Sequence, residues 1–127
     1  MANAKSSSEF YEYATVDTLP DADGYFTNEV RLRYLRKKYK IDKVMFSIRE
    51  EAADLSEADS TLSTITVVLQ FKCPGDARWT TYVPLDGSSL AIGNRLAITD
   101  FGDDVYWRAG VVSDGYTSGS VTFGFDW

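Results

Sequence analysis

The sequence predicts an all-β protein: a single antiparallel β-sandwich, or small barrel, of about seven strands with an extended N-terminal arm. From residue 43 onward, apolar residues recur at every second position, the period of a strand with one buried face. Clusters of Gly, Asp, Ser and Pro separate these alternating segments and predict turns. The 127 residues include one cysteine, so packing must stabilise the fold without an intramolecular disulfide.

The expected arm comprises residues 1–28, and the expected sandwich domain comprises residues 29–127. The arm is polar and rich in turn residues, and the stretch from Ser6 to Val30, which contains most of it, holds six acidic residues and no basic one. A segment of this composition rarely buries enough apolar surface to fold by itself. We therefore expect the arm to become ordered against a neighbouring molecule. Deleting residues 1–23 would then leave a folded β-domain.

Residues 29–40 allow two interpretations. Val30, Leu32 and Tyr34 alternate with arginines, as in a strand. Leu32, Leu35 and Tyr39 also share one face of a helix. A strand that runs into a basic turn is favoured, because the segments that follow are β.

The later strands are each expected to bury one apolar face. In chain order these faces are Val44, Phe46 and Ile48; Ile65, Val67, Leu69 and Phe71; Trp79, Thr81 and Val83; Val105, Trp107, Ala109 and Val111; and Val121, Phe123, Phe125 and Trp127. Residues 90–98 add a strand with a break at Gly93 and Asn94, and residues 50–60 a helix or a long acidic loop. The last strand is expected to form a hairpin with the strand at 105–112 and to bury its four large side chains inside the sandwich.

The residue types argue against catalysis and against a bound cofactor or metal. The chain has no histidine, which removes the commonest general base, the Ser-His-Asp and Cys-His arrangements and the usual zinc sites. Cys73 lies beside Pro74 with no base in view, so a structural thiol is expected. The segment 21–24 predicts a turn, because a calcium loop aligned on its glycine would place Leu19 and Val30 at ligand positions.

A second acidic cluster lies at residues 100–104. Asp100, Asp103 and Asp104 surround Gly102, and hairpin turns use the same residue types as sites for hard cations. A turn is favoured. Two carboxylates for glycoside hydrolysis would have to face one cleft, and nothing in the sequence places such a pair. We expect no enzymatic activity.

Basic residues gather in one segment of an acidic chain. The net charge is −6, yet seven of the 13 basic residues lie between residues 31 and 43. Six of them are the candidate partner-binding residues: Arg31, Arg33, Arg36, Lys37, Lys38 and Lys40. With tyrosines among them they could contact phosphates, but in a chain of this net charge an acidic protein surface is the favoured partner, including that of another copy.

The three tryptophans are candidates for a sugar-stacking platform. Trp107 aligns with Val105 and Val111, which favours the core. Trp79 and Tyr82 lie on opposite faces of one strand, so one of them points outward. Core positions are favoured for Trp79, Trp107 and Trp127.

Two stretches resemble small β-sandwich virion proteins of tailed bacteriophages. "VYWRAGVVSDGYTSGSVTFGFDW" is similar to their C-terminal hairpin, in which an aromatic-Arg-x-Gly-Val strand leads through a "G-Y-T-S-G" connection into a final alternating strand. "VVLQFKCPGDARWTTY" is similar to an earlier strand, turn and "W-T-x-Y" segment. The resemblance covers residues 65–127. Its motifs serve folding, so it carries no functional residues over.

The resemblance implies a non-enzymatic structural subunit of a virion: a capsid decoration or cement protein, a head fibre, or a tail or adaptor component. Its expected partners are other virion proteins and copies of itself, with no membrane, and nucleic acid is a disfavoured partner. It would be made in the host cytoplasm without a signal peptide and would reside in the virion. The alternative is a carbohydrate- or receptor-binding β-sandwich module that contacts a host-surface glycan.

Overall fold

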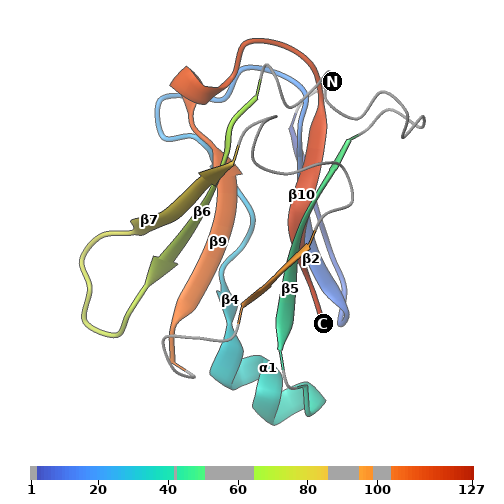
Figure 1. Ribbon diagram of the computed structural model, residues 1–127, viewed down its shortest axis with the longest axis vertical. Coiled ribbons are helices and arrows are strands. Elements are labelled where there is room, and N and C mark those ends of the chain that lie inside the picture. The colour runs from blue at the N-terminus through green and yellow to red at the C-terminus, as the bar shows by residue number, and fades with distance from the viewer. Residues whose placement is uncertain (1–2, 42, 51–64, 86–94, 99–103) are drawn as a thin grey trace.

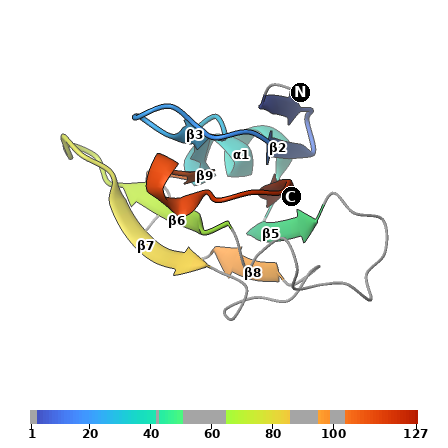
Figure 2. The same ribbon diagram turned by 90° about the horizontal axis from the view of Figure 1, so that it is seen from above.

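Two antiparallel sheets pack face to face in the computed structural model, which describes residues 3–41, 43–50, 65–85, 95–98 and 104–127 (Figures 1 and 2). The predicted all-β sandwich is confirmed, and the sheets do not close into a barrel. The described ranges contain ten strands, more than the seven expected, because the N-terminal segment also supplies strands. The helical segments of these ranges are too short and too polar to cross a bilayer.

The first sheet has the strand order β1-β2-β10-β5-β8. Its strands are β1 (Ala4–Ser7), β2 (Tyr11–Val16), β10 (Val121–Asp126), β5 (Val44–Glu50) and β8 (Arg95–Ile98). The second sheet has the order β3-β9-β6-β7, and β4 also pairs with β9. Its strands are β3 (Tyr25–Phe26), β9 (Tyr106–Val111), β6 (Val67–Lys72), β7 (Thr80–Leu85) and β4 (Val30–Arg31).

The core lies between the sheets and follows the predicted alternation of apolar residues. The buried side chains include Val44, Phe46, Ile48, Ile65, Val67, Leu69, Val105, Trp107, Ala109, Val111, Val121, Phe123 and Phe125. The rings of Phe46 and Phe125 meet at 5.6 Å between centroids. One predicted face is interrupted: Thr81 is exposed, because the β6–β7 register shifts between Leu69 and Gln70. A bulge of this kind changes the face to which the following side chains point.

The N-terminal segment differs from the expected arm. β2 lies between β1 and β10 and is in register with β10 from Tyr11 to Val16. Ala14 and Val16 are fully buried in the core. The buried Glu12 accepts hydrogen bonds from the hydroxyl of Ser7 (2.6 Å) and the backbone N–H of Asn28 (3.2 Å). The sheets therefore continue across the boundary expected at residue 28.

The C-terminal strand also has other neighbours than expected. β10 pairs with β2 on one side and with β5 on the other, whereas β9 belongs to the second sheet, so the expected β9–β10 hairpin is wrong. The segment between β9 and β10 passes from one sheet to the other. It contains the 3-10 turn Ser113–Gly115, followed by Tyr116, which forms an isolated β-bridge with Ile65. The burial of Val121, Phe123 and Phe125 is as expected, and Trp127 is half-buried.

Residues 32–39 form a helix, α1 (Leu32–Tyr39), so the expected strand is wrong beyond Arg31. Leu32 and Leu35 are buried, as the helical stripe required. Lys40 ends the helix in the left-handed conformation (φ 58°), and its backbone N–H donates to the carbonyl oxygen of Arg36. α1 covers one end of the sandwich (Figure 1). The acidic segment after Glu50 and the break at Gly93 and Asn94 lie outside the described residues.

Candidate functional site

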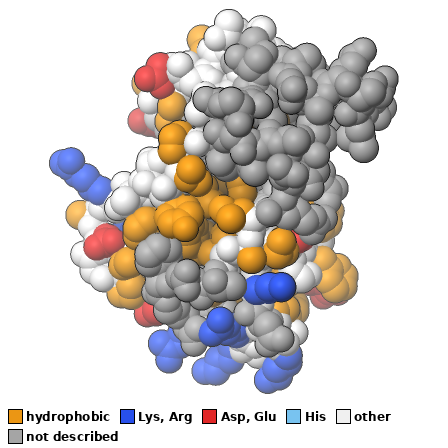
Figure 3. Space-filling model, viewed as in Figure 1, with side chains coloured by type: hydrophobic (Ala, Val, Ile, Leu, Met, Phe, Trp, Pro, Cys, Tyr) orange, Lys and Arg blue, Asp and Glu red, His pale blue; other side chains and the backbone are white. Residues whose placement is uncertain are grey.

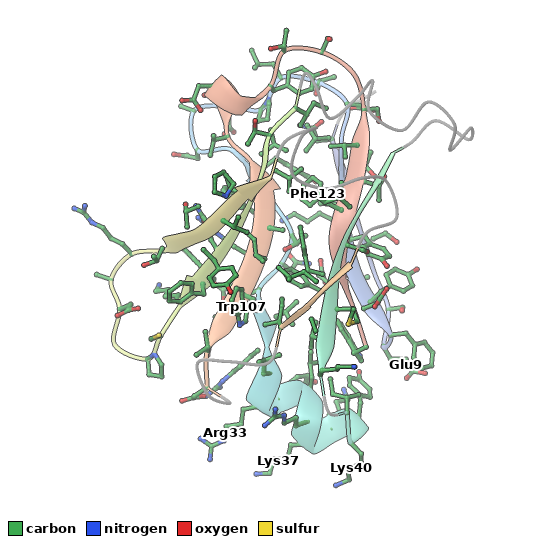
Figure 4. All side chains as sticks on the ribbon, viewed as in Figure 1. Glu9, Arg33, Lys37, Lys40, Trp107 and Phe123 are labelled. Carbon is green, nitrogen blue, oxygen red and sulfur yellow. The ribbon has the colours of Figure 1, made fainter. Side chains whose placement is uncertain are left out.

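The predicted basic cluster lies on α1 and the residues that flank it, at one end of the sandwich. Basic side chains gather at that end of the molecular surface (Figure 3). Arg33, Lys37 and Lys40 are exposed and point away from the two sheets (Figure 4). Because Leu32 and Leu35 anchor the opposite side of the helix in the core, these cations are held on a rigid element. We call Arg33, Lys37 and Lys40 the basic end.

Arg31 has a different role from the other five candidates. Its guanidinium Nε donates to Asp104 Oδ1 at 2.8 Å, its Nη2 contacts the same oxygen, and its Cζ lies 5.1 Å from the ring centre of Tyr106. The hydrogen bond to Asp104 raises the pKa of Arg31, against a smaller opposing effect of burial. Arg31 thus ties β4 to the residues around the start of β9.

Lys38 is held against two tyrosine rings. Its Nζ donates to the hydroxyl of Tyr34 at 3.0 Å and lies 5.5 Å and 5.4 Å from the ring centres of Tyr34 and Tyr39. The hydrogen bond to Tyr34 raises the pKa of Lys38, so the ammonium stays charged at neutral pH. Arg36 is half-buried. These contacts stiffen the surface beside the basic end.

The three cations of the basic end form no ion pair within the described part of the chain, in which Arg31–Asp104 is the salt bridge present. A shallow hollow of about 410 Å³ lies next to them, lined by Arg31, Arg33, Tyr34, Lys37 and Lys38. Carboxylates or phosphates of another molecule match this charge.

The two acidic segments that were weighed as cation sites, residues 21–24 and 100–104, form turns where the structure describes them. The backbone N–H of Gly24 donates to the carbonyl oxygen of Asp21, and the backbone N–H of Asp23 donates to Oδ1 of Asp21, as expected of a turn. Asp104 pairs with Arg31, while Asp100 and Asp103 lie outside the described residues. Within the described ranges no group of three metal-ligating side chains is present.

The single cysteine belongs to the turn after β6. Cys73 is a half-buried free thiol, and its backbone N–H donates to Asp76 Oδ2 at 2.8 Å. The backbone N–H of Asp76 donates back to the carbonyl oxygen of Cys73 at 3.0 Å. Both bonds use the backbone of Cys73, so they shape the turn and leave the thiol without an assigned role.

The three tryptophans occupy different environments. Trp107 is buried in the core, as expected. Trp79 is half-buried on the outer face of the second sheet, where it stacks on the guanidinium of Arg108, whose Cζ lies 4.4 Å from a ring centre. The core position expected for Trp79 is therefore wrong. Tyr82 is 48% exposed but lies on the core side of its strand, with its ring edge-on to that of Trp107 at 5.6 Å between ring centres. Trp127 stacks on Tyr39 with 6.3 Å between ring centres, so the three do not form one platform.

A second surface was missed by the sequence analysis. It is a groove of about 590 Å³ on the outer face of β1, β2 and β10, to which Phe10, Tyr11, Tyr13, Thr15, Asp126 and Trp127 contribute. We call it the outer groove. The sequence did hold a signal, since Tyr11, Tyr13 and Thr15 alternate with the buried Glu12, Ala14 and Val16. The acidic, polar composition of the segment concealed that period.

Comparisons with known proteins add no identification, because no protein-family model, curated protein or solved structure matches this chain. The fold and the two surfaces are therefore the basis for a functional proposal.

Proposed function

We propose that this protein is a non-enzymatic structural subunit of a tailed-phage virion that acts through protein–protein assembly. One observation carries the proposal. The basic end presents Arg33, Lys37 and Lys40 on a helix anchored in the core, and none of them has an ionic partner among the described residues. Cations that are fixed on a rigid element, with no ionic partner in the described ranges, suit docking to another molecule.

The charge of the whole chain favours a protein as that molecule. The net charge is −6 although seven cations gather in residues 31–43, so the remainder of the chain is strongly acidic. A nucleic acid would be repelled by this remainder, whereas an acidic patch on a neighbouring protein, or on another copy, would meet the basic end alone. Complementary charge of this kind sets orientation and speeds encounter.

The virion assignment is supported by the resemblance of residues 65–127 to small sandwich proteins of tailed phages. An open sandwich supplies a rigid body with contacts at its end, which is what a decoration, fibre, tail or adaptor subunit requires. Which of these components it is would follow from its copy number. Hundreds of copies in a particle indicate a shell protein, and a dozen or fewer a tail or connector component.

Quantitative mass spectrometry of purified particles tests the proposal. We expect the wild-type protein at a fixed stoichiometry, and the double variant Arg33→Glu/Lys37→Glu to fold normally yet be lost from the particles. Arg78→Glu is the matched control, because Arg78 is an exposed cation on the turn before β7. Absence of the wild-type protein from particles, or normal incorporation of the double variant, would contradict the proposal. Salt-sensitive binding of a 20-base-pair DNA duplex that the double variant loses would favour nucleic acid instead.

A further inference from the structure

The outer groove combines aromatic rings with hydrogen-bonding groups on a rigid sheet. The rings of Tyr11 and Tyr13 project from β2 and are nearly parallel, with centres 5.1 Å apart and planes 20° apart. Phe10, at the turn before β2, is 61% exposed, an unusual degree for a phenylalanine. Trp127 lines the same groove. Four aromatic side chains thus line one groove, three of them from the start of β2 and the turn before it and one from the residue that follows β10.

Hydrogen bonds hold these groups in place. The hydroxyl of Tyr13 donates to Asp126 Oδ2 at 2.9 Å, and the hydroxyls of Thr15 and Thr122 lie 2.8 Å apart. The indole Nε1 of Trp127 donates to the carbonyl oxygen of Glu9 at 2.7 Å. A site whose side chains are already fixed loses little conformational entropy when it binds a ligand.

The chemistry of the outer groove is that of a sugar site. Its lining among the described residues combines aromatic side chains and hydroxyls with the carboxylate of Asp126, the basic side chain of Lys5 and the small side chain of Ala4, and it holds no Leu, Ile, Val or Met. An aromatic ring can cover the C–H face of a pyranose, while a carboxylate and hydroxyls can bond its ring hydroxyls. The groove volume of about 590 Å³ lies within the range of small-ligand sites.

We propose that the outer groove binds a neutral oligosaccharide, with Tyr11, Phe10 and Trp127 stacking on sugar rings and Asp126 accepting hydrogen bonds from sugar hydroxyls. A neutral sugar is favoured over an anionic one, because Asp126 balances the charge of Lys5, the cation among the described residues that line the groove. The ammonium of Lys5 is also engaged elsewhere, 3.4 Å from Asn28 Oδ1 and 5.4 Å from the ring centre of Tyr25. The exposed cations of α1 form a separate hollow. The site is independent of the basic end.

NMR titration of the uniformly ¹⁵N-labelled protein tests the site. The probes are maltohexaose, cellohexaose, mannohexaose and chitohexaose, each added up to 10 mM. We expect at least one of them to shift the indole N–H resonance of Trp127 and the backbone amides of residues 10–13 and 122–126, in a saturable manner. The indole resonances of Trp79 and Trp107 serve as internal controls, because both lie away from the groove.

Matched substitutions then locate the binding. Tyr11→Ala and Phe10→Ser should each weaken binding of the active sugar by about tenfold, which corresponds to the loss of one stacking contact. Tyr34→Ala and Leu19→Ser should leave the affinity unchanged, since Tyr34 and Leu19 are 52% and 63% exposed at other places. The same spectra report whether each variant is folded.

Three results would overturn the proposal: no saturable shift with any of the four sugars, shifts confined to residues outside the groove, or binding that Tyr11→Ala and Phe10→Ser leave intact. Loss of Phe10→Ser from particles without any sugar binding by the wild type would instead assign the groove to a protein contact. Failure of the sugar titration would leave the incorporation test of the basic end unaffected, and the reverse also holds.

Discussion

The indole Nε1 of Trp127 donates a hydrogen bond of 2.7 Å to the backbone carbonyl oxygen of Glu9. The backbone N–H of Trp127 donates to the carbonyl oxygen of Phe10 at 3.1 Å, and Tyr39 stacks on the indole from α1. One residue thus joins the C-terminus, the turn between β1 and β2, and the end of the helix. These contacts fix the position of the residue that follows β10.

Trp127→Phe tests the contribution of that hydrogen bond. The substitution keeps an aromatic ring against Tyr39 but removes the donor to Glu9. We expect the free energy of unfolding to fall by about 0.5–1.5 kcal/mol, the usual contribution of one such bond. Urea denaturation followed by circular dichroism measures the change. An unaltered unfolding midpoint would show that water replaces the bond at no cost.

Deletion of residues 1–23 should unfold the protein, in contrast to the outcome expected of an arm. The deletion removes β2, which fills the place between β1 and β10 and buries Ala14 and Val16. It also uncovers one edge of β10. We expect loss of the near-UV circular dichroism signal and of cooperative melting. A truncated protein that still melts cooperatively would show that the sandwich tolerates the absence of β2.

Phe123→Ala should be among the most destabilising single changes. Phe123 is fully buried on β10, the strand at the centre of the first sheet. Truncating a buried phenylalanine costs about 3–5 kcal/mol, a large part of the ~5–15 kcal/mol that stabilises a domain. Phe10→Ala is the matched control: Phe10 is 61% exposed, and we expect a change within about 0.5 kcal/mol. Similar unfolding midpoints for both variants would contradict the assignment of the core.

Gly124→Ala should destabilise the sheet through a steric clash. An added Cβ would lie 2.1 Å from the carbonyl oxygen of Glu12 and 2.4 Å from the ring of Tyr13, so β2 and β10 would have to separate. In Gly75→Ala the added Cβ meets nothing within 4 Å, and the positive φ of 86° alone costs about 1–2 kcal/mol. We expect Gly124→Ala to lower the melting temperature more than Gly75→Ala does, as calorimetry would show. The reverse order would mean that the strands separate easily.

Charge reversal in α1 should affect stability with opposite signs at its two ends. Arg33 lies in the first turn, where a negative charge is favourable to the helix dipole, and Lys37 lies in the last turn, where it is unfavourable. We expect Arg33→Glu to raise and Lys37→Glu to lower the free energy of unfolding, each by about 0.3–1 kcal/mol at low salt. Thermal melts at low and high salt measure both. Equal shifts of one sign would indicate that contacts outside the helix dominate.

Local patterns of the sequence were sufficient for the strand faces and for part of the candidate site. Val44, Phe46 and Ile48 are buried because alternation within one strand decides which side chains face the core. The basic end was predicted for a similar reason, since its cations lie within one short segment. The partner of Arg31 was not predictable, because Asp104 is 73 residues away along the chain.

Only the tertiary structure decided how the segments combine. Alternation tells which side chains are buried but not which strand is the neighbour, so β10 could be predicted as a strand while its insertion between β2 and β5 could not. The polar N-terminal segment joins the first sheet because β2, whose side chains alternate between buried and half-buried, pairs with the edge of β10 that β5 leaves open. Residues 32–39 fit both periods, and the helix was selected because it buries Leu32 and Leu35 together at the end of the sandwich, where a single face of side chains meets the core.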